Sequence, residues 1–188
     1  MPSNHHGIAS LELPFGRATL RPMAQLRLTK LDAARRLLET AVDLYFRNGD
    51  PVSIETLTAL AEQIIEDVAK RRNTSALSKD FIAQYVTPEK RGSAKTLREP
   101  RNVLKHADPD EEMIFTPDLN EAHLFLTCMS YRMLTHEKNR RLATIIVWVA
   151  INNPGIIPED QLDKKTIELF RNKPTSKEEY YKMRQGVQ

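Results

Sequence analysis

The sequence predicts a single all-α domain of six or seven helices with an irregular N-terminal arm. Apolar residues recur at helical spacing in several stretches, capping residues precede these stretches, and no stretch alternates convincingly between apolar and polar residues. The 188 residues, 40% hydrophobic and 28% charged, suffice for one soluble domain with a core. We expect an irregular arm over residues 1–27, a helical domain over 28–172 and a C-terminal tail or frayed helix over 173–188.

The first two helices are predicted to form an antiparallel hairpin. Thr29 caps the first helix and Gly49 stops it, Asp50-Pro51 makes the turn, and Ser53 opens the second helix. The short connection places the two helices side by side. Their apolar faces consist of Leu31, Ala34, Leu38, Ala41, Val42 and Tyr45 in the first helix and of Ile54, Leu57, Leu60, Ala61, Ile64, Ile65 and Val68 in the second.

The later helices are marked by caps and prolines. The first two are a short helix between Ser78 and Pro88 and a helix that ends near His106. The next begins after a cap at Asp118 or Asn120 and has an apolar face of Leu124, Phe125, Cys128, Met129, Tyr131 and Leu134. Two more follow: one from the cap Asn139 through Trp148 to Ile151, and an amphipathic helix from Pro158 to Phe170.

Charge is unevenly distributed along the middle of the chain. Ten basic residues and three acidic ones lie between Lys70 and Lys105, whereas the following stretch is acidic. The net charge of +3 is too small to imply a polyanionic partner, but this local excess suits a nucleic acid. Its candidate nucleic-acid-binding residues are Lys90, Arg91, Lys95, Arg98 and Lys105.

The stretch from Arg101 to Asp108 concentrates the residues that could carry chemistry. His106 titrates near neutrality and can move a proton, and the planar fork of Arg101 suits a phosphate. A histidine with an arginine is sufficient for metal-independent cleavage of RNA, in which the 2′-hydroxyl is the nucleophile. The two residues are five positions apart, about 140° around a helix, so they must converge through the reach of Arg101 or at the helix end.

The sequence Arg101-Asn102-x-x-x-His106 resembles the Arg-x(4–6)-His signature of the HEPN superfamily. The resemblance implies an all-helical bundle of bacterial defence or regulation, in many members a metal-independent RNase with its site across a homodimer. It also implies that Arg101 binds the scissile phosphate, Asn102 supports it and His106 is the acid/base.

A second, broader resemblance spans about residues 28–150. Gly49-Asp-Pro-Val-Ser-Ile-Glu-Thr-Leu57 and Asn102-x-x-Lys105-His106-Ala107-Asp108 are similar to segments of a group of bacterial helical proteins without an established activity. The pattern of that group favours a structural or binding role for Lys105, His106 and the supporting residue Asp108.

Whether the protein is an enzyme therefore stays open at this point. A histidine near a helix C-terminus also bonds the last carbonyls, and Asp108-Pro109-Asp110 is ordinary turn chemistry. The runner-up function is a non-catalytic helical module that binds a protein partner. His123 is interpreted as a core-edge residue, His136 as solvated and Cys128 as inert packing.

Composition excludes other classes of protein and site. The single Cys128 rules out disulfides within the chain and fits the cytoplasm. The ten-residue apolar run before Asn152 is too short to cross a bilayer, and no signal peptide is recognised. We expect no metal and no cofactor, because the acidic cluster after His106 lacks the ligand spacing of a calcium loop. The expected partners are RNA, a protein and a second copy of the chain.

Overall fold

A computed structural model of the chain describes residues 25–74, 115–153 and 176–186, together with residue 168. These residues form five helices and no strand, as predicted for an all-α protein. The helices are α1 (Lys30–Phe46), α2 (Pro51–Arg71), α6 (Leu119–Thr135), α7 (Arg140–Asn152) and α9 (Lys177–Gly186). None of the helices in these ranges is long and apolar enough to cross a membrane.

The α1–α2 hairpin forms as the sequence predicts. Thr29 and Asp32 make a reciprocal capping box at the start of α1. The next helix begins earlier than Ser53, because the Asp50 side chain accepts a hydrogen bond from the Ser53 N–H and Pro51 occupies the first helical position. Gly49 suits the tight turn, since a Cβ there would lie 2.9 Å from a methyl group of Leu44 and 3.2 Å from its backbone oxygen.

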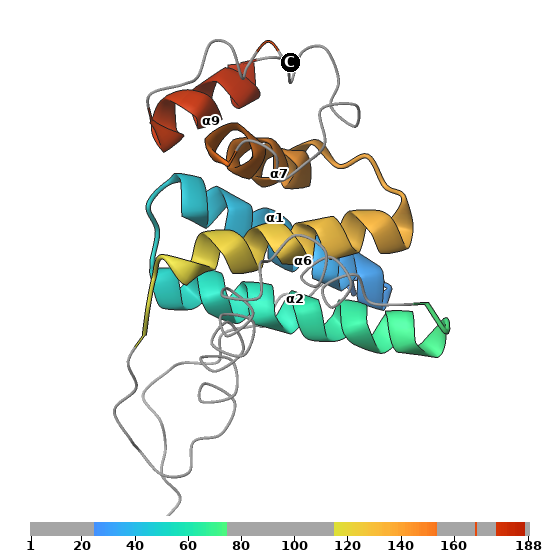
Figure 1. Cartoon of the computed structure of the whole chain (residues 1–188). Coiled ribbons are helices and arrows are strands. Elements are labelled where there is room, and N and C mark those ends of the chain that lie inside the picture. The colour runs from blue at the N-terminus through green and yellow to red at the C-terminus, as the bar shows by residue number, and fades with distance from the viewer. Residues whose placement is uncertain (1–24, 75–114, 154–167, 169–175, 187–188) are drawn as a thin grey trace, which may run out of the picture.

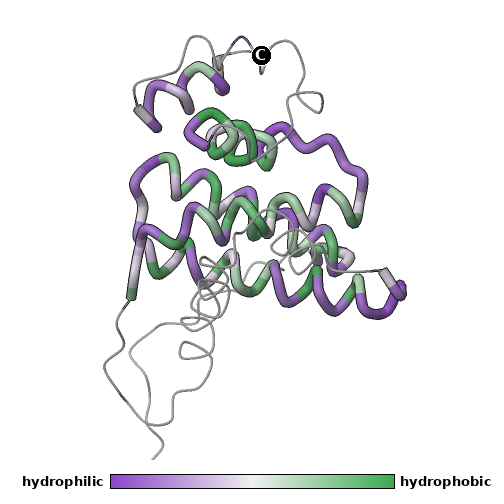
Figure 2. Tube along the Cα trace, in the orientation of Figure 1, coloured by the Kyte–Doolittle hydropathy of each residue, from purple (hydrophilic) through white to green (hydrophobic). Residues whose placement is uncertain are grey.

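The remaining helices build layers on this hairpin. In Figure 1, α6 lies alongside α1 and α2, and α7 and α9 follow it on the α1 side. Asn139 caps α7 as predicted and accepts hydrogen bonds from the backbone N–H groups of Arg141 and Leu142. Figure 2 shows that α7 is largely hydrophobic, which suits its place between α6, α1 and α9.

The core contains most of the residues predicted for it. The buried apolar residues of the first two helices are Ala34, Leu38, Ala41, Val42, Tyr45, Phe46, Ile54, Ala59, Ala61, Ile65 and Ala69. The prediction was wrong for Leu60, which is 48% exposed. In α2 the buried face instead includes two glutamates, Glu55 and Glu62.

The last described helix is anchored by two tyrosines. Tyr180 is fully buried against Phe46 and Trp148, and its hydroxyl donates to the backbone oxygen of Thr144 at 3.0 Å. Tyr181 stacks on Phe46 and donates to the Asp43 carboxylate at 2.7 Å. This helix lies in the segment for which the sequence suggested a tail or a frayed helix. The predicted helices at 78–88, before His106 and at 158–170 lie outside the described residues, apart from residue 168.

Candidate functional site

The residues predicted to carry RNA chemistry lie outside the described residues. These are the proposed catalytic residues Arg101, Asn102 and His106, the supporting Asp108, and the basic residues Lys90, Arg91, Lys95, Arg98 and Lys105. The described part of the basic stretch is the end of α2, where Lys70, Arg71 and Arg72 are all exposed. Three cations at a helix C-terminus are favoured by the helix dipole.

A cavity of about 450 Å³ opens where the first turns of α2 and α6 meet the end of α1. Its lining residues are Tyr45, Asn48, Gly49, Pro51, Ile54, Pro117, Asp118, Asn120, Glu121 and Lys177. Asn120 fixes the two helices to each other at this point, since its side-chain amide donates to the backbone oxygen of Pro51 at 2.8 Å. The packed ends of α1, α2 and α6 therefore frame the cavity, and Lys177 at the start of α9 adds to its rim.

The half-buried carboxylate of Glu121 is the central polar group of this cavity. Its Oε2 accepts hydrogen bonds from the Tyr45 hydroxyl and from Trp148 Nε1, the latter at 3.0 Å. Burial, followed by the hydrogen bond to Glu121, raises the pKa of Tyr45 well above its ordinary value. Tyr45 therefore stays a neutral donor, and the negative charge of the site belongs to the carboxylate.

A positive charge lies over the aromatic ring of Tyr45. The Lys177 ammonium, at the start of α9, is 3.8 Å from the centroid of the Tyr45 ring. A cation over an aromatic face at this distance is an attractive cation–π contact. The last described helix thus contributes both to the aromatic core and to the rim of the cavity.

A second polar cluster is buried between α2 and α6. His123 Nδ1 lies 3.0 Å from both carboxylate oxygens of Glu55, and its Nε2 lies 3.5 Å from Glu62 Oε2. All three side chains are buried. Burial lowers the pKa of His123, but the hydrogen bond to Glu55 and the negative charges of Glu55 and Glu62 outweigh it and raise that pKa to about 9. The ring is consequently an imidazolium at neutral pH.

This buried cluster is better suited to an ion pair than to a metal. The two glutamates engage different nitrogens of the imidazole ring, so they cannot share one ion with it. Among the described residues, no group of three histidine, cysteine or acidic side chains could hold a metal ion. The prediction that His123 lies at the edge of the core was wrong, because its side chain is only 3% exposed. Its Nδ1 is held by Glu55, whereas its Nε2 makes an ion-pair contact with Glu62 but no hydrogen bond.

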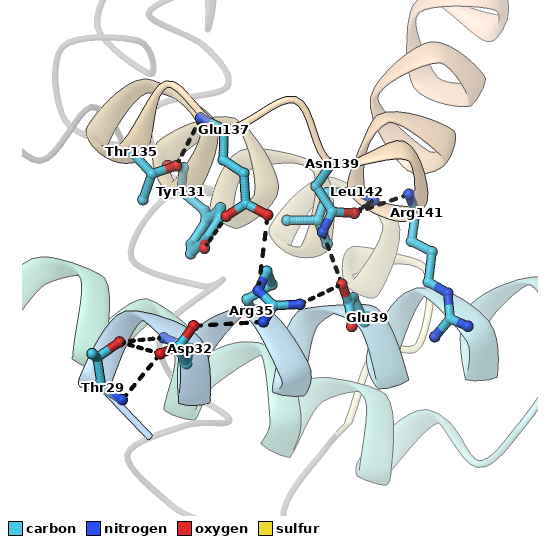
Figure 3. A network of polar contacts seen from close by, with 10 residues as sticks. All are labelled: Thr29, Asp32, Arg35, Glu39, Tyr131, Thr135, Glu137, Asn139, Arg141 and Leu142. Atoms are coloured by element: carbon cyan, nitrogen blue, oxygen red, sulfur yellow. Dashed lines mark hydrogen bonds and ion pairs between the residues drawn. The ribbon is translucent and has the colours of Figure 1, made fainter. Parts of the chain in front are cut away.

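A third polar network joins α1 to the connection between α6 and α7 (Figure 3). Arg35 contacts Asp32, Glu39 and Glu137, the last at 3.8 Å. The amide of Asn139 donates to Glu39 at 2.8 Å. These groups are partly exposed, so the network orients the connection rather than forming a reactive site.

The sequence alone did not indicate which polar residues of α2 and α6 are buried in the core or line the cavity. Glu55 and Glu62 are seven residues apart on the apolar face of a helix, and this spacing is the signal that could have revealed them. Glu121 carried no such signal, because it lies in the acidic stretch that follows Lys105. His136 is exposed as predicted, and Cys128 is fully buried with its pKa raised by that burial.

No protein-family model, no curated protein and no solved structure matches this chain.

Proposed function

We propose that this chain is a HEPN-like helical protein of bacterial defence or regulation that cleaves RNA without a metal. Arg101 binds the scissile phosphate, Asn102 supports that contact and His106 transfers the proton. Lys90, Arg91, Lys95, Arg98 and Lys105 bind the flanking phosphates, with Asp108 as a supporting residue. A homodimer places two such motifs in one assembly, as the HEPN resemblance implies.

The observation that carries this proposal is the sequence Arg101-Asn102-x-x-x-His106 within a stretch rich in basic residues. Two features of the described residues support it. Their regular secondary structure is entirely α-helical, which is the architecture that the resemblance implies. Their histidines offer no competing acid/base, because His123 is buried between carboxylates and His136 is the exposed C-cap of α6.

A second candidate function is a non-catalytic module that binds a protein partner. It is favoured by large apolar side chains that the described helices leave exposed, such as Val52, Leu60 and Met133. Because burying such side chains is favourable, they suit an interface with a partner or with a second copy of the chain. This function needs none of the chemistry of His106.

The deciding experiment incubates the pure protein with labelled RNA in EDTA and compares it with Arg101→Ala and His106→Ala. The enzyme proposal expects cleavage by the original chain and none by either variant, with unchanged circular dichroism. Arg36→Ala and His136→Asn are the matched controls, since both remove the same kind of side chain from exposed positions of α1 and the α6 C-cap.

Absence of cleavage, or equal cleavage by all five proteins, would reject the enzyme. RNA binding is measured separately from the salt dependence of affinity, whose slope reports the number of phosphates neutralised. An interaction module would instead co-purify with a protein partner and lose that partner on Leu60→Glu, whereas the ribonuclease would retain its activity in that variant.

A further inference from the structure

We propose that the cavity beside Tyr45 and Glu121 is a binding site for a small protonated aliphatic amine. The site is separate from the proposed RNA chemistry, because two carboxylates at its rim would repel a phosphodiester. It is carried by three observations on the described residues: an uncompensated carboxylate, a second carboxylate one helical turn away, and an aromatic face that already holds an ammonium group.

The Glu121 carboxylate retains both charge and acceptor capacity. Its two described donors, the Tyr45 hydroxyl and the Trp148 ring N–H, are neutral and both bond Oε2. No cation among the described residues forms an ion pair with Glu121, and none of these residues donates to its Oε1. Because both donors are neutral, neither offsets the charge of a carboxylate, and such a group favours a cationic ligand.

Asp118 supplies a second negative charge on the same turn of α6. It stands at the N-cap position of the helix, yet its side chain makes no capping hydrogen bond, and it is exposed at the rim of the cavity. Residues three positions apart are neighbours on a helix surface, so the two carboxylates can act on one ligand. The arrangement suits an ammonium group between Asp118 and Glu121.

The Tyr45 ring supplies the apolar and polarisable wall. The Lys177 ammonium, 3.8 Å from the ring centroid, demonstrates that this face accommodates a primary ammonium group. A ligand amine on that face would therefore compete with Lys177. The volume of about 450 Å³ lies within the range of small-molecule sites, so a chain of a few carbon atoms fits.

The test titrates the full chain with 1,5-diaminopentane and, as an uncharged match in length, with 1,5-pentanediol. Trp148 is the only tryptophan of the chain, and its ring N–H bonds Glu121, so its fluorescence reports directly on the site. We expect the diamine to shift that fluorescence saturably and to give a binding heat by calorimetry, and the diol to give neither. No response to the diamine, or the same response to the diol, would overturn the site.

Variants then locate the amine by calorimetry. Glu121→Gln should weaken diamine binding about tenfold, because a charge-assisted hydrogen bond is replaced by a neutral one. Asp118→Asn should weaken it several-fold, and as an exposed residue without a described hydrogen bond it leaves the fold intact. Asp67→Asn, the same change near the far end of α2, is the matched control and should leave the affinity unchanged.

Lys177→Ala should strengthen binding by about two- to fivefold, since it removes the competing cation from the ring of Tyr45. Equal affinities in Glu121→Gln, Asp118→Asn and Asp67→Asn would refute the carboxylates as the recognition elements. Weaker binding in Lys177→Ala would refute the placement of the amine on the Tyr45 ring. The amine titrations do not depend on Arg101 or on RNA cleavage. Either proposal can therefore fail while the other stands.

Discussion

Helix α6 takes part in two carboxylate sites on opposite faces, one built around His123 and one around its own Glu121, and the carboxylates of the two sites have different partners. His123 and Glu121 are two residues apart, about 200° around the helix. On one face, two buried glutamates are neutralised by the His123 imidazolium. On the other, Glu121 is held by the neutral Tyr45 hydroxyl and Trp148 ring N–H beside a cavity.

The difference separates a structural ion cluster from a site that can bind a ligand. A carboxylate with a buried cation has its charge compensated internally, and removing the cation leaves an isolated buried charge. A carboxylate that is oriented by neutral donors at an open cavity keeps a charge that an incoming cation can satisfy. Stability should therefore depend strongly on His123 and weakly on Glu121, and ligand binding should show the reverse.

The largest expected loss of stability comes from His123→Leu. The substitution leaves Glu55 and Glu62 buried without their cation, and breaking such a pair costs about 3–5 kcal/mol. Urea unfolding followed by circular dichroism measures the loss. Adding Glu55→Gln in the same background should recover part of the stability, whereas the exposed His136→Asn should change it little. A loss no greater than that of His136→Asn would remove the distinction between the two faces.

The next effect is a loss of stability as pH rises. The pKa of His123 is about 9 in the folded protein and 6.5 in an unfolded chain, so the folded state retains a proton that the unfolded state releases between these values. The protonated His123 therefore stabilises the fold fully below pH 6.5, and this contribution is lost as pH rises through about 9. The free energy of unfolding should fall by about 3 kcal/mol over this interval.

Urea unfolding at several pH values between 6 and 9.5 tests this dependence. The Glu121→Gln variant should lose stability with pH as the original chain does. The triple variant Glu55→Gln, Glu62→Gln, His123→Leu should show a flat profile over the same interval, because it removes the imidazole together with the buried carboxylates that would otherwise titrate in its absence. A pH dependence that survives in the triple variant would assign the proton to another group.

A smaller effect is expected for Asn139→Ala, in the exposed network that joins α1 to the connection before α7. The change removes the α7 cap and the hydrogen bond to Glu39, for a cost of about 1–2 kcal/mol. Asn139→Ser keeps a neutral capping oxygen but loses the donor to Glu39, so thermal unfolding of the two variants separates the contributions. Equal losses would assign the whole effect to the contact with Glu39.

The smallest effect on stability is expected for Glu121→Gln, at about 1 kcal/mol or less. The amide oxygen can still accept from Tyr45 and Trp148, so only the charge assistance of these bonds is lost. Urea unfolding should place the variant close to the original chain, while its diamine affinity falls. A destabilisation as large as that of His123→Leu would make Glu121 a structural residue as well.

Helix positions could be predicted from the sequence because they depend on local interactions. Thr29 and Asn139 cap helices through backbone groups within three residues of themselves, and Pro51 fits a first helical turn wherever it occurs. The apolar period placed Leu38 and Ile65 in the core for the same reason. The proposed RNA-binding residues remain sequence predictions, since they lie outside the described residues.

By itself, the sequence determined that the chain forms amphipathic helices with defined caps. The tertiary structure alone decided that Glu55 is buried, because its partner His123 comes from a helix 68 residues away. The same holds for Tyr180, which is buried only because Phe46 and Trp148 meet it from two other helices. Capping and periodicity act within one helical turn, whereas the burial of a charge or a tyrosine hydroxyl is stable only where a distant segment supplies its partner.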